Sequence, residues 1–297
     1  MIVEQVARDR AASGWRLSAT VRTEARPVGR MLHFILRGGE PDWLPERGDA
    51  FLAALLMPAM RLGEDLVLDA PVSPRLLRAS KSVMEVYRAW GHGLVPVRVE
   101  ARGRLLRDEP EGVGLFFTTG VDSFYSLFKD GELRADPGHR PITDLLYVNY
   151  ERRAIRGYEM VLRRLRRVAG RTGCRTVVLD TNVRELADPL VPWEHYHGAA
   201  LAAAALALQG RLRRCLIAAS EDYSCLSPLG SHPALDPLWS TERLEIVHDG
   251  AEATRTDKVE RMRSVARDAR TRGSHDLAEA AEQAVRRAQL GMETGAW

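Results

Sequence analysis

The sequence predicts an α/β protein in which a doubly wound, parallel five-stranded sheet follows a smaller N-terminal α+β domain. From residue 111 onward, short continuous apolar runs alternate with longer amphipathic segments. Continuous apolar runs of this length are typical of parallel strands that are covered on both faces. Before residue 110 the strand-like and helical segments follow one another less regularly, and the turn-rich segment 107–113 separates the two halves. We therefore expect one domain over residues 1–110 and a second over residues 111–297.

The N-terminal half contains four strand-like runs and two helical segments. The runs cover residues 15–23, 31–36, 66–68 and 94–101. The first helix spans residues 49–57, with Asp49 as its expected N-cap. The second spans residues 73–90, where Ser73 is the N-cap and Pro74 takes the first helical position. We expect this domain to bind a substrate or a partner.

Five apolar runs form the parallel sheet that we expect in the C-terminal half. They cover residues 115–117, 145–149, 176–179, 215–219 and 244–248. An Arg-rich amphipathic helix over residues 156–171 and an Ala-rich helix over residues 198–210 lie between them, and two more helices follow residue 256. The last two helices pack on the core or on a second copy of the chain, and we expect a homo-oligomer.

Composition limits the class of protein. No apolar run reaches the ~20 residues that span a bilayer, and the N-terminus is charged early and lacks the apolar core of a signal peptide. The three cysteines (Cys174, Cys215 and Cys225) form neither a disulfide framework nor the paired spacing of a zinc ribbon. These features favour a soluble, cytoplasmic protein without a membrane partner.

The basic residues of this chain are almost all arginines, while the formal net charge is only +3. Arginine pairs gather on the helix over residues 156–171, whose basic face either meets RNA phosphates or is a solvated surface. No aromatic residues are interleaved there for base stacking. A tRNA partner therefore stays an alternative to a small-molecule substrate, which we favour.

The stretch 114–129 carries the clearest functional pattern. An apolar run ends at Phe117, a short polar turn follows, and Phe124, Leu127 and Phe128 then fall on one helical face. A loop of this kind at the carboxyl end of a strand directs backbone N–H groups and the positive end of a helix at an anion, usually a phosphate. An Asp beside a phosphate indicates a divalent cation between them, although an ordinary helix cap is the alternative. The pattern predicts a Mg-nucleotide site formed by Thr118, Thr119, Gly120, Val121, Asp122 and Ser123.

These six residues resemble the Ser-Gly-Gly-x-Asp-Ser pyrophosphate loop of the N-type ATP pyrophosphatases, the PP-loop superfamily. Gly120, Asp122 and Ser123 match the pattern and Thr118 replaces Ser conservatively, whereas Thr119 stands at the first Gly. If that position requires a positive φ, Thr119 is strained there. The resemblance covers roughly residues 111–250 and implies a HUP-like sheet, bound ATP and Mg²⁺, and roles for Asp122 and Ser123 in catalysis. The chain most resembles the 7-cyano-7-deazaguanine synthases, but it lacks their zinc-binding cysteines.

Other strand ends supply candidates for the same cleft. The resemblance implies that Val148 and Asn149, after the second strand, hold the adenine by backbone contacts. Arg152 either meets a phosphate or is simply exposed. Lys258, with two arginines nearby, either holds pyrophosphate or belongs to a solvated charge cluster.

The loop after the fourth strand adds acidic and imidazole groups. Glu221 and Asp222 either complete a magnesium site with Asp122 or serve as a helix cap and a surface acid. His232, in the proline-rich segment 230–240, either acts as a general acid or base or only makes hydrogen bonds.

The resemblance implies an ATP-dependent ligase. In such enzymes a carboxylate, amide or ureido oxygen attacks the α-phosphorus of ATP, pyrophosphate leaves, and a nucleophile displaces AMP to form a C–N bond. Ammonia or an amine is the donor that we expect, because position 2 is Ile rather than the Cys of an N-terminal glutaminase. Only Cys225 lies where a sulfur-transfer thiolate would be useful. A tRNA-modifying enzyme and a nucleotide-binding protein without catalysis remain the alternatives.

Overall fold

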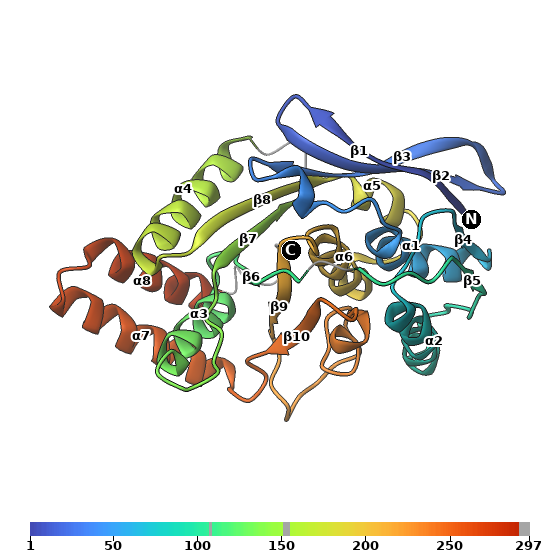
Figure 1. Ribbon diagram of the computed structural model, residues 1–297. Helices are drawn as coiled ribbons and strands as arrows, with labels where there is room; N and C mark the ends of the chain where they lie inside the picture. Colours follow the sequence, from blue (N-terminus) through green and yellow to red (C-terminus); the bar gives the residue numbers. More distant parts are fainter. Residues whose placement is uncertain (107–108, 151–154, 291–297) are drawn as a thin grey trace.

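A single sheet runs through the whole molecule. The structure is a computed structural model that describes residues 1–106, 109–150 and 155–290. Within these residues it is an α/β protein with ten strands, which lie in the order β10-β9-β6-β7-β8-β3-β2-β1-β4-β5, and eight α-helices (Figure 1). The predicted α/β class is confirmed, but the sheet is larger than expected and mixes parallel and antiparallel strands.

Five neighbouring strands in this sheet are parallel. They are β6 (Gly112–Phe116), β7 (Asp144–Asn149), β8 (Arg175–Thr181), β9 (Leu212–Ala218) and β10 (Glu245–Asp249). Each overlaps an apolar run that the sequence pattern assigned to a strand. The chain passes from β6 to β7 and β8 on one side, and then crosses to β9 and β10 on the other. Strand order therefore reverses at β6.

Helices cover both faces of the parallel strands (Figure 1). Leu115 and Phe117 face one apolar cluster, which includes residues of α3, α4, α7 and α8. Phe116, between them in sequence, faces the other cluster, which includes α1 and α6. The bounds of these helices are α1 (Asp49–Leu62), α3 (Val121–Leu133), α4 (Ile155–Thr172), α6 (Trp193–Ala207), α7 (Arg255–Thr271) and α8 (His275–Gln289). Successive residues of a strand point to opposite faces, which explains the uninterrupted apolar runs.

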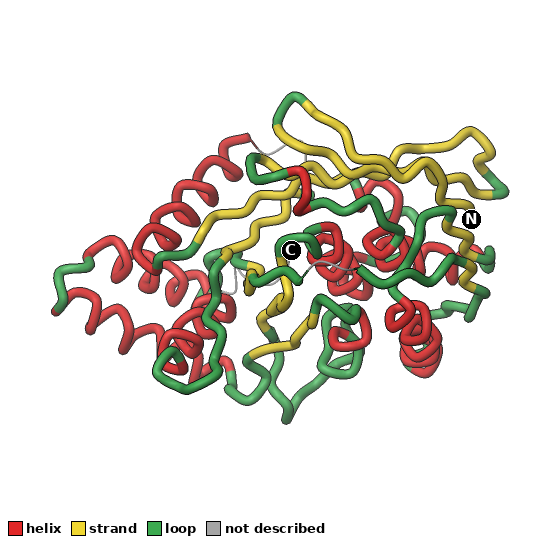
Figure 2. Tube along the Cα trace, in the orientation of Figure 1, coloured by secondary structure: helices red, strands yellow, loops and turns green. Residues whose placement is uncertain are grey.

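The first hundred residues extend the same sheet. They contain β1 (Ile2–Ala11), β2 (Gly14–Thr23), β3 (Arg26–Arg37), β4 (Leu66–Leu68), α2 (Pro74–Ala89) and β5 (Val99–Glu100). Strand β3 pairs with β8 in antiparallel fashion, and one apolar cluster includes Phe34 and Leu179 from these two strands. Figure 2 shows helices on the inner side of β1, β2 and β3. Buried and more exposed residues alternate along most of β2 and along the second half of β3. The domain boundary near residue 110 stays a prediction.

Several N-terminal predictions need correction. Strand β1 was not expected, and the run 94–101 yields only the two residues of β5. Asp49 is not an N-cap, because Gly48 takes that position and Asp49 lies in the first turn of α1. Its fully buried carboxylate accepts hydrogen bonds from Arg47 Nε at 2.6 Å and from the backbone N–H of Ser73 at 2.7 Å. Burial of a charge requires such partners, so Asp49 ties α1 to the start of α2.

A hydrogen bond joins helices α1 and α6, and it replaces one that a proline removes from α1. Pro58 lies inside α1 and has no N–H to donate to the carbonyl of Ala54, four residues earlier. The hydroxyl of Tyr196 on α6 donates to that carbonyl at 2.6 Å, and Tyr196 is fully buried. The Ala-rich sequence of α6 allows the close approach, because methyl side chains leave little space between the two helices.

The structure also contains three short helices. They are the 3-10 helices η1 (Pro41–Trp43) and η2 (Asp236–Trp239) and the α-helix α5 (Val183–Ala187). No helix in the described part of the chain has both the length and the apolar character required to cross a lipid bilayer.

Candidate functional site

The loop over residues 118–123 lies where the sequence pattern placed it, between the carboxyl end of β6 and the start of α3. Thr119 has a φ of 62°, in the left-handed region, and is 1% exposed. A β-branched residue rarely adopts this conformation, so the strain that we expected at Thr119 is present. Gly120 is the N-cap of α3 in an extended conformation, and its carbonyl accepts a hydrogen bond from the Ser123 hydroxyl at 3.0 Å.

Four backbone N–H groups of this loop have no acceptor among the residues that the structure describes. The N–H groups of Thr119, Gly120, Asp122 and Ser123 donate no hydrogen bond to any residue that the structure describes. The early N–H groups of a helix have no acceptor within the helix and favour an anion. The loop therefore combines unsatisfied donors with a strained backbone at one point.

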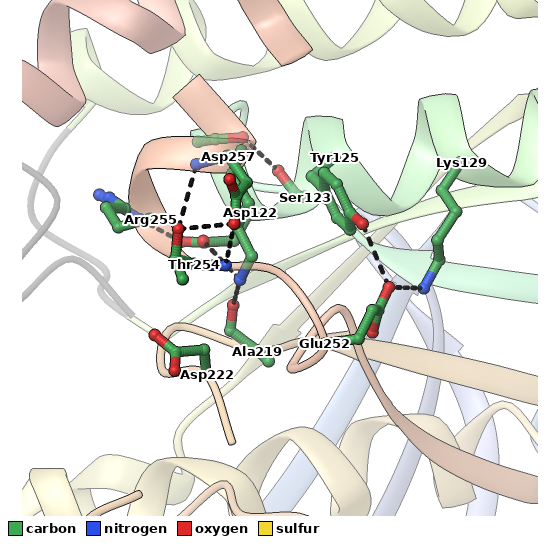
Figure 3. Close-up of polar contacts among 12 residues, drawn as sticks. Asp122, Ser123, Tyr125, Lys129, Ala219, Asp222, Glu252, Thr254, Arg255 and Asp257 are labelled. Atoms are coloured by element: carbon green, nitrogen blue, oxygen red, sulfur yellow. Dashed lines mark hydrogen bonds and ion pairs between the residues drawn. The ribbon is translucent and has the colours of Figure 1, made fainter. Parts of the chain in front are cut away.

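Three cationic side chains converge on the loop from the two C-terminal helices. Arg255 of α7 binds Oδ2 of the Asp122 carboxylate at 2.6 Å (Figure 3). Lys258, on the same helix, binds the other oxygen, Oδ1, at 3.2 Å. Lys258 Nζ also donates to the carbonyl of Ala219 at 2.7 Å, beyond the end of β9. Arg287 of α8 donates to the carbonyl of Thr119, and its Nη2 lies 2.9 Å from the hydroxyl of the same residue.

The buried cation of this cluster is paired with Asp122. Lys258 is only 1% exposed and shares the Asp122 carboxylate with Arg255, whereas Arg287 contacts Thr119. The pKa of Asp222 is lowered mainly by hydrogen bonds from Ser224 and further by the charge of Lys258. A buried cation is costly without a counter-charge, so Lys258 requires the Asp122 carboxylate beside it.

The start of α7 holds two of these cations in place. Thr254 is the N-cap, and it forms a capping box in which its side chain accepts from the N–H of Asp257 and the Asp257 carboxylate accepts from Thr254. Both hydrogen bonds fix the first turn, which carries Arg255 and Lys258. Lys258 was a candidate from the sequence, and Arg255 is one of the two arginines near it, so this part of the cluster could be predicted.

The three-carboxylate metal site predicted from Asp122, Glu221 and Asp222 is not formed. Glu221 Oε2 accepts from the backbone N–H of Ser227 at 2.7 Å, and Asp222 Oδ1 accepts from the backbone N–H of Ser224 at 2.9 Å. These are the local turn contacts that the sequence left open as the alternative. In the described residues, no group of three His, Cys, Asp or Glu side chains is arranged to hold a metal ion.

His232 lies in a different cluster from Asp122. Its ring packs edge-on against Trp90 at 5.0 Å between centroids, and its Nδ1 accepts from the backbone N–H of Ala234 at 2.9 Å. Burial lowers the pKa of His232. No hydrogen bond joins it to Asp122 or Ser123 among the described residues, so its predicted role at the loop has no geometric support.

The predicted adenine contacts lie on the opposite side of the loop from β9. Asn149, at the end of β7, donates from Nδ2 to Asp180 Oδ1 at 2.8 Å, and Asp180 Oδ2 accepts from Arg37 Nε at 2.5 Å. Val148 is half-buried and packs on the core beside α1 and α6. Arg152 lies outside the described residues.

The structure also assembles residues that the sequence did not indicate. Asp236 in η2 is fully buried, and its Oδ2 lies 2.7 Å from His248 Nδ1 at the end of β10 and 2.7 Å from the Ser231 hydroxyl. Arg287 is 168 positions from Thr119, and the Ala-rich pattern of its helix indicates packing only. No local signal in the sequence could have found either contact.

The arginines of α4 are partly engaged in packing the C-terminal helices. Arg171 lies 2.8 Å from Asp276 of α8, and Arg167 lies 3.4 Å from Glu279. Burial raises the pKa of the thiols of Cys174 and Cys215, whereas Cys225 is exposed. The two ion pairs favour the alternative in which this face serves structure, and only Cys225 remains a candidate thiolate.

Comparison with known proteins identified no relative of this chain. No protein-family model, no curated protein and no solved structure matches this chain. What can be said of function therefore depends on the loop over residues 118–123 and the cations around it.

Proposed function

We propose that this protein is an ATP-dependent enzyme of the adenylating, AMP-forming type, in which the loop over residues 118–123 binds the phosphate chain of the nucleotide. The observation that carries the proposal is the position of that loop. It follows β6, the strand at which strand order reverses, with β7 on one side and β9 on the other. In open α/β sheets, ligands bind beyond the carboxyl ends of the strands at this point of reversal.

The order of the parallel strands also supports a nucleotide site at this loop. Numbered from β6 in chain order, the five strands lie in the order 3-2-1-4-5, with helices on both faces. We infer a doubly wound, HUP-like core, to which the antiparallel strands β1, β2 and β3 have been added at the β8 edge. The fold by itself does not specify a reaction, so the functional argument rests on the loop.

The residues at the loop suit stabilisation of a leaving pyrophosphate. The free N–H groups of Thr119, Gly120 and Ser123 would donate to phosphate oxygens, while Lys258 and Arg255 would neutralise the charge that develops as pyrophosphate departs. Asp122 positions both cations. A carboxylate, amide or ureido oxygen of a small molecule would attack the α-phosphorus, and an amine or ammonia would then complete the C–N bond.

Magnesium is not assigned a protein ligand set. Both oxygens of Asp122 are engaged by Arg255 and Lys258, and Glu221 and Asp222 are engaged in local turns. These donors do not fit a resident metal in this arrangement. A Mg²⁺ ion that arrives with the nucleotide would be coordinated mainly by phosphate oxygens.

Two other functions have some support. A nucleotide-binding protein without catalysis is favoured by the strain at Thr119 and by the contact of Arg287 with that residue, since both restrict the loop. A tRNA-modifying enzyme would use the exposed arginines of α4, although Arg167 and Arg171 are paired with α8.

The first test is binding of ATP and of α,β-methylene-ATP by isothermal titration calorimetry, in the presence of Mg²⁺. Replacing Arg255 with Gln should weaken binding about tenfold, because a charge-assisted contact to a phosphate is lost. Arg261→Gln is the matched control, since Arg261 lies on the same helix and pairs with Glu132 instead. Equal affinities for the two variants would contradict the assigned site.

The second test identifies the products. ATP should release pyrophosphate and AMP when supplied with pools of small carboxylic acids and ammonia, and release of phosphate and ADP would contradict adenylation. Addition of total tRNA separates the tRNA alternative, which predicts that turnover requires RNA. Binding of ATP without any release of pyrophosphate would favour the protein without catalysis.

A further inference from the structure

A cavity of about 250 Å³ lies apart from the β6–α3 loop, in the N-terminal part of the sheet. It is bounded by the strands β2 and β3, by the second half of α1, and by α5 with the turn that follows it. Figure 1 shows β3, α5 and α1 next to one another in this region. Six of the side chains that line it are Met1, Val21, Leu55, Pro58, Leu186 and Leu190. The body of the cavity is therefore apolar.

The walls of this cavity are rigid. Val21 lies on β2, which pairs with β3, and Pro58 is fixed within α1, whose Ala54 carbonyl is bound by Tyr196. Pro189 restrains the turn on the other side. A water molecule occupies about 30 Å³ of liquid, so the cavity has room for about eight groups of methylene size. A preformed apolar space of this kind favours an aliphatic chain over water.

The cavity has cationic groups at its edge. Arg26 and Arg30 line it from β3, and Arg30 is the cross-strand partner of Val21, which places both on one face of the sheet. Neither guanidinium forms an ion pair or hydrogen bond with another residue in the described part of the chain. Glu185 is the carboxylate among the lining residues. The edge therefore carries a net charge of +1, from two arginines and one glutamate.

The N-terminal ammonium does not add to this charge. It donates to the carbonyl of Asp65 at 2.7 Å and pairs at 2.9 Å with the Glu64 carboxylate, and Glu64 is buried. The excess cationic character is consequently located on the β3 side, at Arg26 and Arg30.

We propose that this cavity binds an amphipathic carboxylate with an unbranched aliphatic chain of about eight carbons. The chain occupies the apolar space between β2 and α1, and the carboxylate binds Arg26 and Arg30. Guanidinium groups present two parallel N–H donors that match a carboxylate, and each buried methylene adds to the affinity. The site is independent of the nucleotide loop, so it stands whether or not the protein adenylates a substrate.

The test compares four small ligands by isothermal titration calorimetry at one ionic strength. Octanoate has both features, 1-octanol lacks the charge, octylammonium reverses it, and acetate lacks the chain. Octanoate should bind at least tenfold more tightly than 1-octanol, octylammonium should bind more weakly still, and acetate should not bind measurably. The proposal is overturned if 1-octanol binds as tightly as octanoate, if acetate does, or if none of the four binds.

Charge variants locate the carboxylate. The double variant Arg26→Gln, Arg30→Gln should lower the affinity for octanoate to that for 1-octanol and leave 1-octanol unaffected. Arg22→Gln is the matched control, because Arg22 follows Val21 on β2, lies on the opposite face and pairs with Glu4 at 2.7 Å. If Arg22→Gln weakens octanoate binding as much as the double variant does, the ligand is held by general charge and the site is wrong.

Filled variants locate the chain. Leu190→Trp and Leu62→Trp place an indole in the cavity from two different elements, and Leu62 is already 37% exposed, so at least one variant should fold. Folding is checked by circular dichroism and thermal unfolding. Each folded variant should bind both octanoate and 1-octanol at least tenfold more weakly than the unchanged protein. Undiminished binding in a folded variant would overturn the assignment.

Discussion

Thr119 is the residue at which the sequence and the structure agree most closely on an unusual feature. The PP-loop pattern that this loop resembles has Gly at this position, and the φ of 62° explains why Gly would be favoured. The chain instead carries a β-branched residue whose carbonyl and hydroxyl both accept from Arg287. Strain of this kind persists only where the surroundings hold it, and here Arg287 is the side chain that does so.

Replacement of Thr119 should separate the backbone strain from the hydroxyl contact. Thr119→Ala removes the hydroxyl but keeps a Cβ at positive φ, whereas Thr119→Gly removes both. We expect the Gly variant to be more stable than the Ala variant by about 1 kcal/mol, because only Gly relieves the left-handed conformation. Urea unfolding at one pH measures the difference. Equal stability of the two variants would mean that Thr119 stores no strain.

Three partly buried histidines predict how stability depends on pH. Burial is the main cause that lowers the pKa of His195, His197 and His232, and His92, stacked on His195 at 3.7 Å, lowers the pKa of His195 further. The unfolded chain takes up these protons near the ordinary pKa of 6.5, before the folded chain does. The free energy of unfolding should therefore be retained above pH 6.5 and decline as the pH falls toward 5.

Urea unfolding at pH 7.5, 6.5 and 5.5 measures this decline. The double variant His195→Gln, His232→Gln should show a shallower loss between pH 6.5 and 5.5, because fewer protons are taken up on unfolding. His275→Gln, at an exposed position on α8, is the control and should keep the full slope. A double variant with an unchanged slope would assign the pH dependence to other groups.

At the scale of elements, the packing of α1 on α6 depends on one hydrogen bond that replaces another. Pro58 removes the backbone donor that would serve the Ala54 carbonyl, and the Tyr196 hydroxyl serves it instead. Tyr196→Phe should lower the free energy of unfolding by about 1–3 kcal/mol, because a buried carbonyl then lacks a partner. Thermal or urea unfolding of the purified variant measures the loss.

The proline provides the control for this prediction. Pro58→Ala restores an N–H that can donate to the Ala54 carbonyl, so the loss caused by Tyr196→Phe should be smaller in that background. A double-mutant cycle gives the coupling directly. Strictly additive effects would show that the two residues do not serve the same carbonyl.

At the scale of the whole molecule, the sheet is continuous across the expected domain boundary. Strand β3 pairs with β8, and a single apolar cluster includes Phe34, Phe51 and Leu179 together with the Ala-rich helix α6. Removal of the first 110 residues would expose the β8 edge and one face of α6. Exposed edges and apolar faces of this extent lead to aggregation rather than an independent fold.

Expression of residues 111–297 alone tests this expectation. The fragment should fail to give a cooperative unfolding transition, whereas the full chain should unfold in one. A fragment that folds cooperatively as a monomer would support the boundary near residue 110 and would show that the shared apolar cluster is not required.

Prediction from sequence succeeded where the signal is local. The parallel strands, the loop over residues 118–123 and the capping of α2 by Ser73 follow from neighbours within a few residues, and the structure has each of them. Glu221, Asp222 and His232 were assigned by proximity to strand ends, and the structure gives them local turn or packing contacts instead. The same residue types serve turns and sites, and sequence spacing alone does not distinguish the two.

The sequence by itself determined that strands and helices alternate after residue 111 and that a short polar loop joins the first parallel strand to a helix, because periodicity and turn chemistry are properties of short segments. Only the tertiary structure decided that Arg287 reaches Thr119, that Asp236 meets His248, and that β3 joins the first half of the chain to β8. These contacts join residues far apart in the chain. They form because burial of apolar surface brings whole elements together, and no short segment of sequence encodes which elements will meet.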